Sequence, residues 1–327
     1  MKKLFYLAAA AMTIVSCAKQ EVVDVPKSAA IGFDTFVGKN TRADDVTTAN
    51  LETFYVYGQY KADGGSVVTP FNGETVSKDG SDWTYSPLRY WVADAVYKFA
   101  ASAPKADASF DYDSNTLSIS DYTVANDNAD LIVAAYATTG VTGKENSNDK
   151  VQFAFVHALS KVLFTFTSEW ESEVNVTVSD IALSGVINKG TAEVTMGTAT
   201  EVEWTGSDTG SYSYSDLSGF DFNDPNPTEA KYLRPQVLGS TVTLTFTVTV
   251  DALPEGENEK TVTVTLPTDT VAEWENGKVY NYTLTINAGN VFNLEPIQFG
   301  DISVSDWDDE NSTPDLTPEQ GVYPPVE

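Results

Sequence analysis

The chain is short of several residue types that exported and metal-binding proteins commonly use. It has one cysteine, one histidine and three arginines among 327 residues. A single cysteine rules out an intramolecular disulfide bond. One histidine and one cysteine serve a zinc site poorly. The apolar run at residues 4–15 is too short to span a membrane as a mature helix. Stability must therefore come from a hydrophobic core.

Positive charge is also scarce. Asp and Glu number 47 against 19 Lys and Arg, which gives a formal net charge of −28. A field of this sign repels phosphate backbones, so we expect no nucleic-acid partner. Hydrophobic residues make up 42% of the chain, enough to bury one or two cores. Two β-rich domains are the natural count at this length.

The first residues have the features of an export signal. A basic start, an apolar run over residues 4–15 and a small residue precede the lone Cys17. This order predicts a signal peptide over 1–16 and an exported protein. The tetrapeptide IVSC, which ends at Cys17, resembles a bacterial lipobox, where the thiol receives a diacylglycerol. We therefore expect a lipid on Cys17 that holds the protein on a membrane.

Beyond residue 50 the sequence reads as short strands joined by turns. Thr, Val, Tyr, Phe and Ile alternate with polar residues and are interrupted by Gly, Asn, Asp and Pro. In TVTLTFTVTV, residues 241–250, every even position is apolar, which predicts one buried and one solvated face. The spacing favours two stacked β-sandwiches. The expected strands cover 31–37, 51–60, 97–101, 116–119, 131–137, 151–157, 162–167, 174–183, 241–250, 261–266, 278–286 and 297–304.

A change of parity marks a boundary in the middle of the chain. In VQFAFVHALSKVLFTFT the apolar residues occupy odd positions before Ser160 and even positions after it. Such a slip requires a bulge or a chain break, which we place near Ser160. We therefore predict domains over 43–165 and 166–307. Residues 308–327 are acidic and Pro-rich and have no strand period.

No arrangement of residues points to catalysis. His157 lies in an apolar strand and is best interpreted as a core residue, because no Ser or Cys nucleophile motif accompanies it. Acidic loops such as DYDSN at 111–115 make calcium the better metal candidate, but Thr116 stands where an EF-hand loop needs glycine. We expect no enzyme activity, no metal and no cofactor. Aromatic residues in turn-rich stretches leave glycan stacking open: Trp83, Tyr85, Tyr212, Tyr214 and Phe220.

One arginine is well placed for proteolysis. Arg42 lies in GKNTRADD, residues 38–45, a polar run of the kind where nicking concentrates. Arg89 is crowded by bulky neighbours in SPLRYWV, and Arg234 directly precedes a proline, which generally blocks Arg-specific cleavage. The pattern therefore predicts a cut between Arg42 and Ala43 by an Arg-specific protease.

Several motifs occur in an order that resembles the fimbrillin superfamily of Bacteroidetes. They are the lipobox cysteine, IGFDTFV, TRA, WTYSPLRYWVADAVYKFAASAP, FVHALSKVLFTF and WENGKVYNYTLTI. The resemblance implies an all-β protein of two transthyretin-like Greek-key β-sandwich domains in tandem. It further implies a stalk or tip subunit of a type V pilus, exported as an outer-membrane lipoprotein precursor and present on cell-surface fimbriae. Its partners would be other pilin subunits, either copies of itself or paralogues, an Arg-specific protease, and the outer membrane through the lipid on Cys17.

The segment before Arg42 has the pattern of a removable strand. Ile31, Phe33 and Val37 share one parity, so the apolar side of this strand can fill a groove between sheet edges. Removal of a propeptide over 17–42 would leave unpaired backbone groups and an apolar slot. A neighbouring subunit could repair the slot with its own strand. Our candidate for the donated strand has apolar residues on both sides of a parity slip at Gly300: Ile297, Phe299, Ile302 and Val304.

A second function class remains open from the sequence. If the C-terminal strand does not exchange, the protein would accept a strand and give none, as a tip adhesin. If Arg42 is not cut, it would remain a lipid-held surface protein. In either case it could bind a glycan or a host protein without polymerising.

Overall fold

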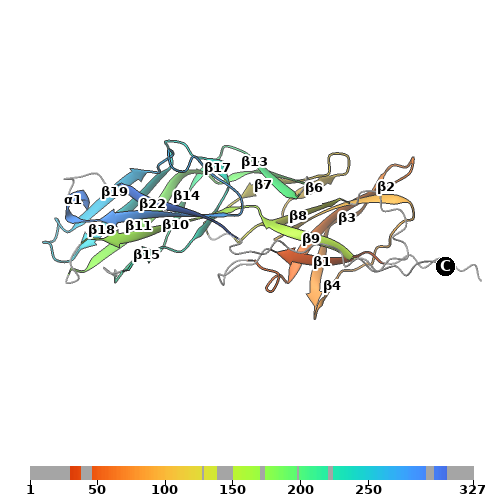
Figure 1. The fold of residues 1–327 in the computed structure, drawn as a ribbon, viewed down its shortest axis with the longest axis horizontal. Coiled ribbons are helices and arrows are strands. Elements are labelled where there is room, and N and C mark those ends of the chain that lie inside the picture. Colours follow the sequence, from red (N-terminus) through yellow and green to blue (C-terminus); the bar gives the residue numbers. More distant parts are fainter. Residues whose placement is uncertain are drawn as a thin grey trace, which may run out of the picture.

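The computed structural model describes residues 30–37, 46–126, 129–137, 150–169, 174–196, 199–219, 224–291 and 298–307. Within these ranges the chain is all-β, with one four-residue helical turn, α1 (Ala288–Val291). Its sheets stack along an elongated molecule, with the N-terminal strands in red and orange at one end and strands β18 and β19 in blue near the other (Figure 1). The predicted all-β class and tandem sandwiches are confirmed. Among the residues that the structure describes, no helix is long and apolar enough to cross a membrane.

The largest sheet has seven strands and contains the N-terminal segment. β1 lies at one edge and pairs in parallel with β9, whereas every other neighbour pair in this sheet is antiparallel. The two ends of this sheet come close, because Lys150 of β9, the strand next to β1, pairs with Asp82 of the edge strand β4 at 3.3 Å. In spatial order the strands are β1 (Gly32–Val37), β9 (Lys150–His157), β8 (Ile132–Ala137), β5 (Ala95–Ala103), β2 (Thr53–Ala62), β3 (Val67–Asp79) and β4 (Asp82–Thr84).

The remaining described strands form four further sheets. One holds β15 (Asn226–Pro227), β10 (Ser160–Ser168), β21 (Lys278–Ile286) and β22 (Phe299–Asp306), with β16 (Lys231–Leu233) also paired to β10. A second holds β14 (Thr209–Ser213), β11 (Val176–Ile187), β18 (Thr243–Val250) and β19 (Glu259–Thr265). A third holds β13 (Thr200–Thr205), β12 (Lys189–Met196), β7 (Thr116–Thr123) and β6 (Ala108–Asp111). β17 (Gln236–Val237) and β20 (Glu273–Trp274) form a two-stranded ribbon.

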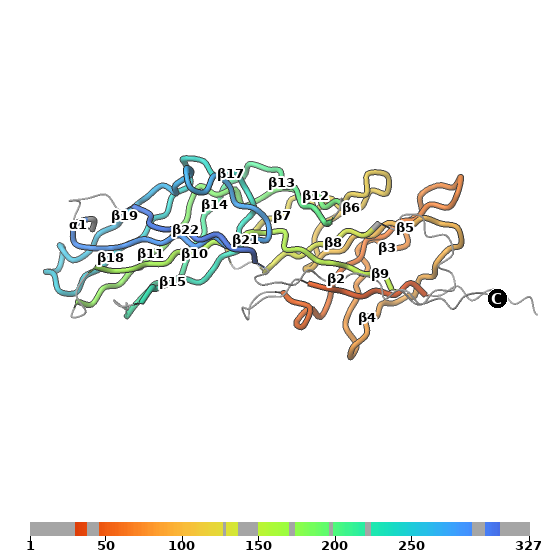
Figure 2. The backbone as a smooth tube through the Cα atoms, in the orientation of Figure 1, coloured from red at the N-terminus to blue at the C-terminus, as the bar shows by residue number. Residues whose placement is uncertain are grey.

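The third sheet joins early and late parts of the chain. β7 pairs with β12, so residues near 120 lie beside residues near 190, as the tube in Figure 2 shows where β6 and β7 meet β12 and β13. One large hydrophobic cluster extends from this sheet into the C-terminal sheets, and a second, rich in aromatic rings, fills the inside of the seven-stranded sheet. The predicted domain boundary between residues 165 and 166 falls inside β10 (Ser160–Ser168). The division into domains 43–165 and 166–307 stays a prediction.

All twelve strands expected from the sequence are present, with ends that differ by a few residues. The chain break expected near Ser160 lies between β9 and β10, at residues 158–159. β3 is not among the expected strands; it contains Pro70, a residue that is usually excluded from a strand interior. The β2–β3 register shifts opposite Gly58 and Tyr60, so Pro70 lies at an irregularity of the ladder where its missing N–H is tolerated.

Candidate functional site: the β1 groove

β1 fills a groove along β9 with its apolar side. The register runs from Gly32 opposite Lys150 to Val37 opposite Phe155. The side chains of the apolar parity, Ile31, Phe33 and Val37, are buried, with exposed fractions of 1%, 0% and 1%. The intervening residues are partly exposed. A single alternation in a short segment thus predicted correctly which face would point into the core.

Phe33 lies at the centre of the aromatic cluster. Its ring stacks on Phe153 of β9, with centroids 5.8 Å apart, and meets Phe71 of β3 edge-on at 5.4 Å. Tyr85 lies 5.5 Å away and Phe99 of β5 lies 6.0 Å away. The strands that carry these rings span most of the seven-stranded sheet, so removal of β1 would expose the inside of the whole cluster.

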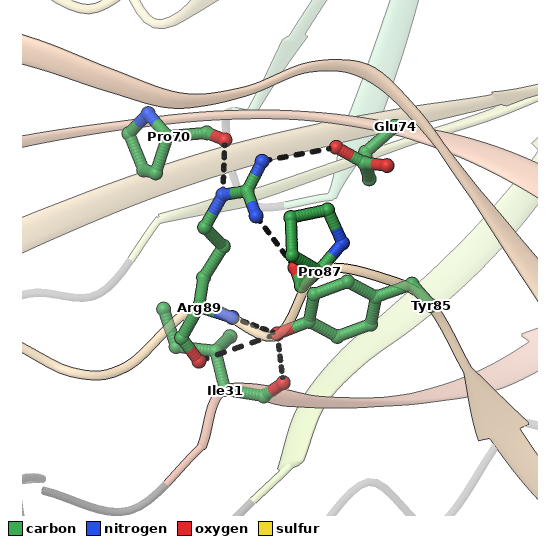
Figure 3. Close-up of polar contacts among 6 residues, drawn as sticks. All are labelled: Ile31, Pro70, Glu74, Tyr85, Pro87 and Arg89. Carbon is green, nitrogen blue, oxygen red and sulfur yellow. Dashed lines mark hydrogen bonds and ion pairs between the residues drawn. The ribbon is translucent and has the colours of Figure 1, made fainter.

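Hydrogen bonds hold the beginning of β1 (Figure 3). The Ile31 amide donates to the Arg89 carbonyl oxygen at 2.8 Å, and the Tyr85 hydroxyl donates to the Ile31 carbonyl oxygen at 2.7 Å. The Arg89 amide in turn donates to the Tyr85 oxygen at 3.2 Å. Burial raises the pKa of Tyr85 above its ordinary value, so the hydroxyl remains a donor. Both backbone groups of Ile31 are therefore satisfied from one short segment.

The end of β1 is held by a single side chain. The Val37 amide donates to the Thr48 hydroxyl oxygen at 2.8 Å, and that hydroxyl donates to the Val37 carbonyl oxygen at 2.9 Å. Residues on both sides of the segment 38–45 are thus tied to each other. A cut within 38–45 would leave β1 seated by its ladder, its core contacts and this bond.

The structure places two of the three arginines in firm contacts. Arg89 donates from Nε to the Pro70 carbonyl oxygen at 3.1 Å and pairs with Glu74 at 3.3 Å (Figure 3). Arg234 is 4% exposed and donates to the Gly206 carbonyl oxygen at 3.2 Å. Arg42 and Ala43 lie outside the described residues, as do Cys17, the signal peptide 1–16 and the tail 308–327.

β22, the candidate donated strand, is an edge strand with little burial. It pairs antiparallel with β21, and the register shifts between Tyr282 and Leu284, which matches the parity slip noted at Gly300. Phe299 and Ile302 are partly buried and Val304 is 49% exposed. Ile297 lies outside the described residues. β22 therefore contributes little to the core through its own side chains.

The residue after β22 is held much more firmly. Trp307 is 4% exposed, stacks on His157 at 4.3 Å and lies 5.4 Å from the Tyr232 ring. The Lys161 ammonium lies over the Trp307 ring, 4.5 Å from its centroid. The Trp307 amide donates to the Gly277 carbonyl oxygen at 2.7 Å. Sequence reasoning missed this cluster, because its members come from separate strands and share no local pattern.

His157 is a core residue, as the sequence suggested. It is 1% exposed, and its Nδ1 lies 2.7 Å from Oδ2 of the buried Asp130. Among the residues that the structure describes, no group of three or more His, Cys, Asp or Glu side chains could hold a metal ion. Two of the aromatic residues considered for glycan stacking are buried, and their hydroxyls donate to backbone carbonyls: Tyr212 and Tyr214.

Tyr97 of β5 gives the N-terminal sheet an alkaline pH dependence. Burial raises the pKa of Tyr97 from 10.0 to about 12, opposed in part by the hydrogen bond from the Val92 amide. Between these two pH values the unfolded chain has lost a proton that the folded chain keeps, so the free energy of unfolding falls as pH rises. The contribution is complete below pH 10. Urea unfolding at pH 8, 10 and 11 should show this fall, and it should be smaller in Tyr97→Phe. Equal slopes in both proteins would contradict the assignment.

The fold places this chain in the class of all-β proteins built from tandem β-sandwiches. A comparison with protein-family models matches residues 41–307 to the fimbrillin-like family, and the chain belongs to that family. Its members are structural and adhesion proteins, not enzymes, and fimbrial proteins lie at the cell surface. The predicted family and the absence of enzyme activity are therefore confirmed. The search of curated proteins found no match.

Solved structures show the same fold. A fimbrial protein from Bacteroides vulgatus is 17% identical, with a TM-score of 0.58, over 85% of this chain and 99% of that one. A putative cell adhesion protein from Bacteroides ovatus is 16% identical, with a TM-score of 0.53, over 87% and 99%. A putative cell adhesion protein from Bacteroides uniformis is 18% identical, with a TM-score of 0.51, over 85% and 98%. At these identities the likeness is one of fold.

Proposed function

We propose that this fimbrial protein is a structural subunit that assembles by strand exchange after a cut between Arg42 and Ala43. The observation that carries the proposal is β1: an edge strand whose apolar side chains fill the centre of a core and which is followed in the sequence by the polar run that contains Arg42. An edge strand of this kind can be replaced by another chain without rebuilding the sheet.

The energy of such a joint would be large. Each fully buried Val, Ile or Phe side chain contributes roughly 1.5–3 kcal/mol, and each hydrogen bond adds about 1 kcal/mol net. Phe33 alone has the Phe54, Phe71 and Phe153 rings as neighbours. A strand that supplied equivalent side chains would hold two subunits together durably.

Proteolysis alone would not empty the groove. Because Thr48 and Tyr85 hold the two ends of β1, the cut strand remains seated until another strand competes for β9. We infer that the cut makes β1 replaceable, and that an incoming strand expels it together with the lipidated residue Cys17. In this scheme membrane release and assembly are coupled, and the partners are other fimbrial subunits and an Arg-specific protease.

The test is cleavage of the purified precursor by an Arg-specific protease. We expect a new N-terminus at Ala43, followed by a ladder of multimers that resists mild detergent. Arg42→Lys is the matched control, because it keeps the charge and the polar segment but removes the cleavage site; it should stay monomeric. Cleavage elsewhere, or no cleavage at Arg42 in the folded protein, would overturn the proposal.

Trp307 favours a second candidate, in which the protein accepts a strand and gives none. Its burial against His157 and Tyr232 pins the end of β22 to the body of the molecule. A tip adhesin or a non-polymerising surface lipoprotein that binds a glycan or a host protein would behave in this way. It would be trimmed at Arg42 and would bind an added strand, but it would form no multimers by itself.

A further inference from the structure

One face of the sheet formed by β14, β11, β18 and β19 consists almost entirely of hydroxyl side chains. This sheet lies in the half of the molecule away from β1 (Figure 1). The even residues of β18 are buried in the core. The odd residues lie on the other side of the strand and are all threonines: Thr243, Thr245, Thr247 and Thr249.

The neighbouring strands continue this pattern. On β19 every residue opposite these threonines is also a threonine, except Glu259 opposite Thr249. β11 places hydroxyl residues opposite them on the other side, except at Ala182, and β14 adds two serines beside β11. We name these rows the hydroxyl face; its hydroxyl members on β11 and β14 are Thr177, Ser179, Ser184, Ser211 and Ser213.

Hydroxyls of this face are held in place by bonds to each other across the strands. The Thr245 and Thr263 oxygens lie 3.0 Å apart, and so do those of Ser184 and Ser211. Threonine is branched at Cβ and has few rotamers, so these side chains lose little freedom when a partner covers them. The hydroxyl face is therefore prepared for contact at a low entropy cost.

The hydroxyl face is also an exception to the charge of the protein. The chain has a formal net charge of −28, and the exposed side of β13 in a different sheet carries Glu201 and Glu203. The paired rows of the hydroxyl face carry one carboxylate, Glu259 at one end, and Asp180 lies beside them at the bulge of β11. Strand propensity favours threonine in any sheet, so it does not explain why carboxylates are left out of this one.

The near absence of charge matters most for a partner that is itself acidic. Small ligands such as single sugars bind in concave sites lined by aromatic side chains, which the described rows of this face do not have. A second copy of this chain carries the same −28 and can approach closely only where like charges do not meet. Ser and Thr hydroxyls both donate and accept hydrogen bonds, so the face is complementary to itself.

We propose that the hydroxyl face is a lateral contact between two copies of this chain. Four strands about 4.8 Å apart, with roughly seven residues of about 3.3 Å each, cover roughly 400 Å² per copy. A stable complex buries about 800 Å² per partner, so a single pair of copies associates weakly and reversibly.

In a fimbria the same contact would be repeated along two neighbouring filaments, and the repeats would strengthen one another. The contact between two copies does not depend on strand exchange. Its role in joining filaments rests on the strand exchange proposed above.

Sedimentation equilibrium of the uncut protein tests the contact. Every protein in the series carries Cys17→Ser, so that no lipid drives association. We expect the parent protein to dimerise reversibly, and to do so more strongly as salt rises from about 50 mM to about 300 mM, because salt screens the repulsion between copies. A parent protein that stays monomeric at about 1 mM in the higher salt would overturn the proposal.

Thr263→Glu should weaken this dimer about tenfold or more, because like charges then meet across the contact. Thr263 is exposed on β19, so the variant should fold and melt like the parent. Thr205→Glu is the matched control: it makes the same change of charge at an exposed threonine of β13, in a different sheet, and should dimerise like the parent. Equal weakening by the two variants would show an effect of net charge alone and would overturn the proposal.

A charge swap tests whether the two hydroxyl faces meet each other. A mixture of Thr263→Glu and Thr263→Lys should associate at least as strongly as the parent, because opposite charges then meet across the contact. The same pair of substitutions at Thr205 should give no gain over the parent. If the Thr263 mixture associates no better than Thr263→Glu alone, the faces do not meet and the proposal is wrong.

Protein trimmed at Arg42 separates a failure of this inference from a failure of strand exchange. If multimers form, light scattering should show that the parent multimers bundle, whereas Thr263→Glu multimers form equally fast and stay separate. Bundling of both would overturn the role of the face in joining filaments. If no multimers form, the proposed strand exchange fails, and dimerisation of the uncut protein still decides whether the contact exists.

Discussion

Phe33→Ala is expected to lower the free energy of unfolding of the uncut protein by about 3–5 kcal/mol, the usual cost of truncating a fully buried phenylalanine. Phe33 is 0% exposed, and its ring packs against rings from four other strands, among them Phe54 and Phe71. Little of the cavity can close, because the surrounding rings are held by different strands of one sheet. Urea unfolding followed by tryptophan fluorescence gives the change directly.

Phe36→Ala is the matched control for this prediction. Phe36 lies on the same strand with the opposite parity and is partly exposed, so its truncation should cost about 1 kcal/mol or less. After cleavage at Arg42, the Phe33→Ala protein should also exchange its cut strand faster than the wild type. If Phe33→Ala and Phe36→Ala destabilise the protein equally, the apolar side of β1 is not what fills the groove.

Trp307→Ala is expected to destabilise the protein by about 3 kcal/mol and to loosen β22 selectively. The ring is buried and packs against His157 and Tyr232, whereas most side chains of β22 are exposed. Its loss removes most of the burial that holds the strand end. Hydrogen exchange should therefore accelerate over β22 (Phe299–Asp306) while the centre of β11 (Val176–Ile187) stays protected.

Val304→Ala is the control for the strand itself, because Val304 is 49% exposed and its truncation should cost well under 1 kcal/mol. Assembly then separates the two proposed functions. If β22 is donated, Trp307→Ala should form multimers faster than the wild type after cleavage. If the protein only accepts a strand, the variant should remain monomeric. Unchanged exchange over β22 in Trp307→Ala would contradict the view that the ring holds the strand end.

Local pattern predicted the strands well where one face of a sheet is buried. The even positions of 241–250 are buried in β18, and the odd threonines lie mostly on the half-exposed face. Prediction failed where a strand bends. β3 contains Pro70 and the positive-φ Gly73, and both residue types are typical of turns. In the folded protein the irregular register between β2 and β3 accommodates them within a strand. β12 and β13 are not among the expected strands, although β13 alternates strictly between half-buried and exposed residues; β12 pairs with both β13 and β7.

The candidate site, too, could be predicted from the sequence only in part. The burial of Ile31, Phe33 and Val37 follows from their parity alone. The parallel partner β9 does not, because it lies more than a hundred residues away and no local signal records such a pairing. In the sequence, Tyr85 and Arg89 likewise lie in a turn-rich stretch with no sign of a binding role. Their hydrogen bonds to Ile31 exist only because the folded chain brings this stretch beside the start of β1.

The amino-acid sequence by itself determined twelve of the strands of this fimbrillin-like protein, the apolar face of those that alternate, and the family to which the chain belongs. These are properties of residue type and short spacing, and they survive in any arrangement of the sheets. Only the tertiary structure decided that the first strand is an edge strand seated parallel to β9, that Thr48 and Tyr85 hold its ends, and that Trp307 pins β22. The reason is physical: edges, clamps and stacked rings arise from contacts between distant segments, and such contacts exist only after the chain has folded.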